Sequence, residues 1–202
     1  MRVAAVVIVV LVAGWGWTTC SRHRTEQRLA TVASELAGRK VGVKCQGFWA
    51  SMVDIGQRSG EVDFPPGRPP DHMFLVRGVC GRLKSFFDSR SHHDLDCLTS
   101  IDWDHWSFDD GFDAPCERNA RGDAEAVNTL AHESMHLRGI QSESAAQCLA
   151  IQADAWTVAR LGGTPDQGLA VARFVLALQP GVPPEYQFSS CPLPTTPSIP
   201  PS

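Results

Sequence analysis

An uncharged stretch of nineteen residues, Val3 to Ser21, opens the chain and decides in which compartment the rest of the protein folds. Nineteen helical residues, at about 1.5 Å each, roughly cross the core of a bilayer. The stretch therefore predicts a retained signal-anchor or transmembrane segment over residues 1–23, which places the protein at the cell membrane with a single pass. Its apolar heart also has the length of a signal sequence, so a cleaved signal peptide and a lipid-modified Cys20 are the alternatives.

Six more cysteines lie in the body of the chain: Cys45, Cys80, Cys97, Cys116, Cys148 and Cys191. An even set behind an export signal is typical of disulfide bonds in an oxidising compartment. We therefore expect the domain to be extracytoplasmic, or secreted if the signal is cleaved, although the basic residues after the apolar stretch alone favour the opposite orientation. Six cysteines allow fifteen sets of disulfide pairs, and buried free thiols are the alternative. We expect Cys191 to pair with Cys148.

Between the apolar start and a proline-rich end lie about 155 residues, the length of one domain. The formal net charge is -4 and no basic stripe occurs, so nothing predicts a nucleic-acid partner. We expect a juxtamembrane helix over 24–40, a domain over 41–179 and a tail over 180–202, which holds eight of the fourteen prolines.

Hydrophobic spacing predicts a fold that is mainly α with a small β element, stabilised by disulfides. Weak alternation indicates short strands at 41–45 and 61–64. Apolar residues at helical spacing, with capping residues and glycine stops, predict five helices, over 24–38, 71–87, 123–138, 143–161 and 165–178.

Residues 88–123 are crowded with aspartates and read as a long loop tied by disulfides. Calcium binding is an alternative, although the aspartates do not follow the register of an EF-hand loop. The loop also contains His92, His93 and His105, which are either polar surface or contacts to a substrate or metal.

The clearest motif is His132-Glu133-Ser134-Met135-His136, within one of the expected helices. Histidines four residues apart lie on the same helix face, so both imidazoles can bind one zinc ion at about 2.0–2.1 Å. Glu133 projects beside that metal, where a carboxylate can take a proton from zinc-bound water and pass it to a leaving amine. The motif predicts zinc with His132 and His136 as ligands and Glu133 as the catalytic base.

A catalytic zinc site needs a third protein ligand and one open position. Glu143, seven residues after His136 and at the start of the next helix, is the leading candidate, although the helix dipole also favours an acidic residue there without any metal. Asp154 is the alternative ligand. Gln147 is expected to support the ligands, and Tyr186, the only tyrosine, is a candidate for stabilising an oxyanion.

The segment HESMHLRGIQSESAAQCLAIQ resembles the active-site helix pair of zincin metallopeptidases, nearest to the gluzincin type, and is also similar to small membrane-anchored bacterial proteins. The resemblance implies a glutamate on the following helix as third ligand, which falls on Glu143. It differs from the metzincin pattern, whose third histidine position holds Ser142 here.

These features predict a zinc-dependent hydrolase, specifically a metallopeptidase that cleaves peptide or protein substrates outside the cytoplasmic membrane. The strand at Glu61 to Phe64 would be the edge along which substrate lies. The alternative is a catalytically silent envelope module in which zinc only holds the helix pair together.

Overall fold

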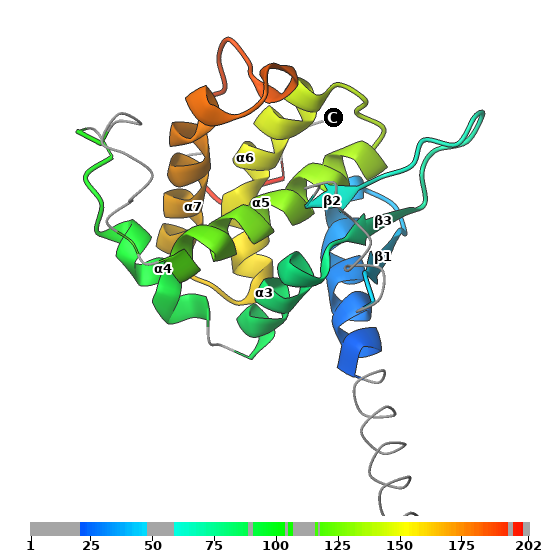
Figure 1. Cartoon of the computed structure of the whole chain (residues 1–202), viewed down its shortest axis with the longest axis horizontal. Helices are drawn as coiled ribbons and strands as arrows, with labels where there is room; N and C mark the ends of the chain where they lie inside the picture. The colour runs from blue at the N-terminus through cyan, green and yellow to red at the C-terminus, as the bar shows by residue number, and fades with distance from the viewer. Residues whose placement is uncertain are drawn as a thin grey trace, which may run out of the picture.

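The computed structural model describes residues 21–47, 59–88, 91–103, 105–106, 116, 118–193 and 196–199. Helices form most of this part, and a small three-stranded sheet lies at one side (Figure 1). The expected class, mainly α with a small β element, is therefore confirmed. The anchor expected at residues 1–23 falls almost wholly outside the described ranges. Within those ranges, we find no helix whose length and apolarity would suffice to span a bilayer.

The sheet has the order β1-β3-β2, with β1 (Gly42–Cys45) parallel to β3 (His72–Leu75) and β2 (Gly60–Glu61) antiparallel to it. The prediction for β1 is confirmed, whereas the strand expected at 61–64 is a two-residue strand that ends at Glu61. The prediction of one continuous helix over 71–87 is wrong, because α3 covers only Arg77–Phe87. In β3, buried Met73 and Leu75 alternate with more exposed neighbours, which is the period of a strand.

Four further helices are α4 (Ser91–Thr99), α5 (Arg118–Leu137), α6 (Glu143–Leu161) and α7 (Pro165–Ala177). The loop expected over 88–123 is wrong at both ends, since α4 buries Leu95 and Leu98 and α5 begins before Asp123. Asp123 is not a helix cap: it is buried within α5 and accepts a hydrogen bond from Arg82 at 3.1 Å. The starts and ends predicted for α6 and α7 are confirmed to within a residue.

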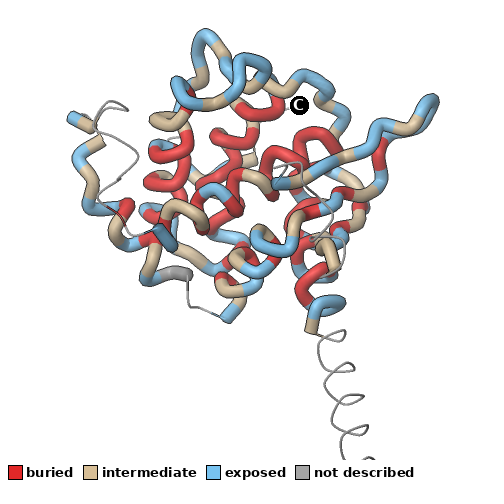
Figure 2. The backbone as a smooth tube through the Cα atoms, viewed as in Figure 1, coloured by how far each residue is buried: buried red, intermediate tan, exposed pale blue. Residues whose placement is uncertain are grey.

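Helix α5 lies at the centre of the molecule, in contact with α3, α4, α6, α7 and the sheet (Figure 1). Figure 2 shows that the buried residues gather where these elements face one another. Residues 21–37 are also helical, and Leu29, Val32 and Leu36 from this helix belong to the same core. Burial of each such side chain stabilises the fold by roughly 1.5–3 kcal/mol.

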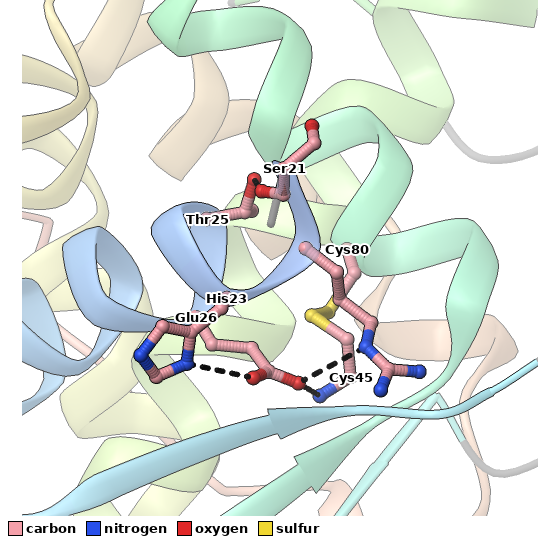
Figure 3. The surroundings of a disulfide bond; sticks show 7 residues. Ser21, His23, Thr25, Glu26, Cys45 and Cys80 are labelled. Atoms are coloured by element: carbon pink, nitrogen blue, oxygen red, sulfur yellow. Dashed lines mark hydrogen bonds and ion pairs between the residues drawn. A yellow bond between two sulfur atoms is a disulfide. The ribbon is translucent and has the colours of Figure 1, made fainter. Parts of the chain in front are cut away.

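Three disulfides tie the periphery to this core: Cys45–Cys80, Cys97–Cys116 and Cys148–Cys191. The expected pair of Cys148 and Cys191 is confirmed. Figure 3 shows the first disulfide, beside which Glu26 accepts a hydrogen bond from the backbone N–H of Cys45 at 2.9 Å. The third disulfide fixes the chain after α7, which forms two 3-10 turns, η2 (Gln179–Gly181) and η3 (Pro184–Tyr186).

Candidate metal centre

Two histidines of α5 face one point in space. His132 and His136 are one helical turn apart, and their Nε2 atoms lie 3.0 Å from each other. Both side chains are buried, with 7% and 6% of their surface exposed. The spacing of the motif thus brings the two ring nitrogens together as expected for a pair on one helix face.

Helix α6 brings a carboxylate to the same point. Its first residue, Glu143, places Oε2 3.0 Å from Nε2 of His132 and 3.1 Å from Nε2 of His136. The chain reverses between the helices at Gly139, whose φ of 105° is in the left-handed region that favours glycine. Ser142 then caps α6 by accepting a hydrogen bond from the N–H of Ala145.

The backbone fixes which nitrogen of His136 carries the proton. Nδ1 lies 2.6 Å from the carbonyl oxygen of Ile140, and a carbonyl only accepts, so Nδ1 donates. In the neutral ring, Nε2 then keeps its lone pair, as a metal ligand must. Burial, followed by the charge of His136, lowers the pKa of His132 and so favours the neutral form of the His132 ring.

The three atoms lie close enough together to bind a single metal ion. Two imidazole nitrogens and a carboxylate oxygen this close repel one another unless a proton or a cation lies among them. Ligands arranged tetrahedrally around zinc at about 2.0–2.1 Å are about 3.3 Å apart, and the separations here fall roughly 0.3 Å short of that. Among the described residues, His132, His136 and Glu143 form a group that could hold a metal ion, and no described aspartate of the expected loop joins such a group.

Glu133 lies beside this group and against strand β2. It is 6% exposed, its Oε2 atom makes no hydrogen bond with the described protein, and its side chain closely approaches Gly60. Burial, followed by the charges of Glu143 and Glu61, raises the pKa of Glu133 to about 8. In the absence of a cation, the carboxyl group therefore holds a proton at neutral pH.

His132, His136 and Glu143 line a cavity of about 750 Å³. Residues 59–62 with Phe64 form one part of the lining, α5 and α6 form the floor, and the end of α7 with the two 3-10 turns forms a third part. Phe64 meets the His136 ring edge to face, with centroids 5.7 Å apart, and the Tyr186 ring lies 5.6 Å from that of His132. The expectation that 180–202 is merely a tail is thus incomplete, because its first turns line the site.

The other residues singled out from the sequence fall in different places. Gln147 lines the cavity and donates a hydrogen bond to Asn128 at 3.0 Å. Asp154 is not a ligand: it is buried between α5 and α6 and accepts a hydrogen bond from Asn128 at 3.1 Å. His93 and His105 are exposed and lie near aspartates of their own segment, away from the cavity, and the side chain of His92 is outside the described part.

Asn128 and Gly60 line the site but were not predicted from the sequence. Asn128 precedes His132 by four residues, so the same helical periodicity that identified the histidine pair would have placed it on the ligand face. No local signal indicates that Gly60 approaches Glu133, since the contact joins segments 73 residues apart.

Comparisons of the chain with models of protein families, with curated proteins and with solved structures find no match. The geometry of the site is therefore the basis for a functional assignment.

Proposed function

We propose that the protein is a zinc-dependent metallopeptidase of zincin type, with His132, His136 and Glu143 as metal ligands and Glu133 as the catalytic base. The observation that carries this proposal is the triangle of ligand atoms, 3.0–3.1 Å on each side, on the floor of an open cavity. A zinc ion held there would lower the pKa of a bound water to about 7 and polarise a peptide carbonyl.

The other catalytic roles are assigned to Glu133 and Tyr186. Glu133, next to the first ligand, accepts the proton of the attacking water and delivers it to the leaving amine. Its place supports this role, because Glu133 lines the same cavity as the three ligands and its Oε2 makes no hydrogen bond with the described protein. Tyr186, which lines the cavity with its ring 5.6 Å from that of His132, is the candidate for donating a hydrogen bond to the developing oxyanion.

The cavity is suited to an extended peptide. Strand β2 stands at the edge of the sheet and also lines the cavity, so an incoming strand can add to its outer side through backbone hydrogen bonds. We therefore still propose that substrate binds along the edge of this strand, which starts at Gly60. With residues 1–23 as an anchor or signal, cleavage would occur outside the cytoplasmic membrane.

The second candidate is a silent envelope module with a structural zinc ion. Structural zinc sites are almost always closed by four protein ligands, whereas the group found among the described residues has three. A fourth position that faces a cavity favours catalysis over a purely structural role.

The decisive experiment compares the purified full chain with its Glu133→Gln variant. We expect the wild type to bind one zinc ion per chain and to cleave peptides from an unbiased library in a chelator-sensitive manner, while the variant retains zinc without turnover. Glu35→Gln is a matched control, because Glu35 is an exposed residue outside the cavity whose side chain forms an ion pair with Arg160. Undiminished cleavage by the Glu133→Gln variant would refute the assigned base, and a chain that binds no zinc would refute the site.

A further inference from the structure

One ring nitrogen of the metal group is buried without a well-aligned hydrogen bond. This atom is Nδ1 of His132, which has no hydrogen-bond partner of regular geometry in the described protein. When Nε2 of the same ring binds zinc, as proposed above, the neutral imidazole carries its proton on Nδ1, which then needs an acceptor. The corresponding nitrogen of His136 has an acceptor in the carbonyl oxygen of Ile140.

Three buried polar side chains form a hydrogen-bonded chain between α5 and α6. Asn128 of α5 donates through Nδ2 to Oδ2 of Asp154 at 3.1 Å, and Gln147 of α6 donates through Nε2 to Oδ1 of Asn128 at 3.0 Å. An amide side chain has one NH₂ group and one oxygen. Because both amides donate in the direction of Asp154, the chain ends in an acceptor, Oε1 of Gln147.

This end of the chain lies within reach of the His132 ring. Burial has the largest influence on the pKa of His132 and lowers it, whereas a hydrogen bond with the Gln147 side chain raises it. An acceptor has this effect because it stabilises the protonated ring. Since Nε2 faces His136 and Glu143, Nδ1 is the nitrogen left for Gln147, and a rotation of its amide would align the two groups.

We propose that Gln147 and Asn128 are positioning residues that hold the His132 ring for zinc. Oε1 of Gln147 accepts the proton of Nδ1, so the lone pair of Nε2 points at the metal. Asp154 sets the direction in which both amides donate, although it lies two side chains away from the ring. The inference rests on the proposed zinc site and extends it to residues that do not touch the metal.

Two substitutions of Gln147 separate the acceptor from its bulk when the purified full chain is titrated with zinc against a zinc-sensitive dye. Gln147→Leu removes the acceptor and should lower zinc affinity by about 10- to 100-fold. Gln147→Glu keeps an acceptor oxygen and should stay within about 3-fold of the wild type, although its buried charge makes the protein less stable in urea. Affinity that followed packing alone would show the opposite order.

Two more variants complete the series. Asn128→Ala interrupts the chain one side chain earlier and should lower zinc affinity by about 3- to 10-fold, so the test does not depend on the folding of Gln147→Leu. Gln152→Leu is the matched control, since Gln152 lies on the same helix outside the cavity and hydrogen-bonds to Sγ of Cys148. Its zinc affinity should equal that of the wild type.

NMR of the zinc-loaded chain with isotope-labelled histidine observes the proposed contact directly. We expect hydrogen-bonded Nδ1–H signals from both His132 and His136 in the wild type. In Gln147→Leu only the His132 signal should move upfield, because His136 donates to the backbone of Ile140. The His136 signal is therefore an internal control for general loosening of the site.

Zinc affinity that neither Gln147→Leu nor Asn128→Ala lowers overturns the inference, as does an equal loss in the leucine and glutamate variants of Gln147 or an equal shift of both histidine signals. A chain that binds no zinc overturns the inference and the proposed function together. Peptide cleavage is scored separately. Zinc affinity that depends on Gln147 without any cleavage would refute the peptidase and leave the positioning role standing, whereas cleavage with unchanged zinc affinity in Gln147→Leu would do the reverse.

Discussion

Gly60 of β2 lies so close to Glu133 of α5 that a Cβ atom at position 60 would be 2.7 Å from both Cγ and Oε1 of the glutamate. Carbon atoms do not approach so closely, so any side chain at position 60 would have to push the Glu133 side chain aside. The strand that forms one wall of the cavity therefore also confines the carboxyl group to which we assign the base.

Replacing Gly60 with Ala should displace the Glu133 side chain while leaving the metal ligands in place. Because a misplacement of about 1 Å can cost roughly 100-fold in rate, we expect kcat/KM to fall 10- to 100-fold with unchanged zinc stoichiometry. Gly78→Ala is the matched control, since nothing lies within 4 Å of a Cβ there. Full activity in the Gly60→Ala protein would mean that the glutamate is not held by this contact.

Glu143 is the only acidic member of the group that could hold a metal ion among the described residues. Replacing Glu143 with alanine leaves only the two imidazoles to bind zinc. Zinc affinity should therefore fall by at least about 100-fold, which is more than the loss of a residue that only hydrogen-bonds to a ligand causes. Glu185→Ala removes a glutamate from the same cavity and should leave zinc affinity within about 3-fold. Competition against a zinc-sensitive dye measures both, and equal affinities would remove Glu143 from the ligand set.

The raised pKa of Glu133 predicts how the stability of the metal-free protein depends on pH. From its usual 4.5, burial and neighbouring carboxylates raise the pKa to about 8. Between these values the folded protein holds a proton that the unfolded chain releases, so the free energy of unfolding falls as pH rises. The contribution is fully present below about 4.5 and is lost on passing through 8.

Glu133→Gln cannot titrate and should lose this slope, so that the variant becomes relatively more stable towards pH 8, by on the order of 1–4 kcal/mol. Urea unfolding of both metal-free proteins at pH 5, 6.5 and 8 measures the difference. Zinc favours the ionised carboxylate and should flatten the wild-type curve. Parallel curves for the two metal-free proteins would contradict the assigned burial.

The helix pair of the site follows from local sequence. The spacing of His132 and His136, the Gly139 stop and the Ser142 cap act within a few residues, so periodicity and capping rules place the ligands of α5 and the start of α6. The start of α5 was missed because Asp123, a typical capping residue, is instead buried as a partner of Arg82, which is 41 residues away in the sequence.

The walls of the site could not be predicted in this way. Gly60 and Tyr186 reach the motif from about 70 residues before it and about 50 after it, through a sheet and a disulfide. Their side chains carry no pattern that marks such contacts. The residues of strand β3 were predicted to be part of a helix, because four residues are too few to recognise the alternation of buried and exposed side chains that is typical of a strand.

Asp154 anchors a buried polar chain behind the site. Asn128 donates to its Oδ2, and Gln147 donates to Asn128, while burial raises the pKa of Asp154 well above its usual value. Asp154→Ala would leave the Asn128 amide without an acceptor and should lower stability by about 1–3 kcal/mol. Asp154→Asn keeps the shape and an acceptor oxygen, so urea unfolding at neutral pH should find it at least as stable as the wild type. A loss equal to that of the alanine variant would show that the ionised form is required.

The disulfide between Cys148 and Cys191 should matter for peptide binding as well as for stability. It spans 43 residues and holds the chain after α7, including Tyr186, against the cavity. Chain entropy predicts that replacing both cysteines with serine costs about 4 kcal/mol. The loosened wall should also weaken peptide affinity several-fold, while zinc affinity stays near normal, since the ligands lie on α5 and α6.

Cys97→Ser with Cys116→Ser is the matched control for this variant. That disulfide spans 19 residues and ties α4 to the chain before α5, away from the cavity lining. Its loss should lower stability by about 3 kcal/mol and leave peptide affinity unchanged. If both double variants weaken peptide binding equally at a temperature where both are folded, general loosening is the cause, and the wall held by Cys191 has no specific part in substrate binding.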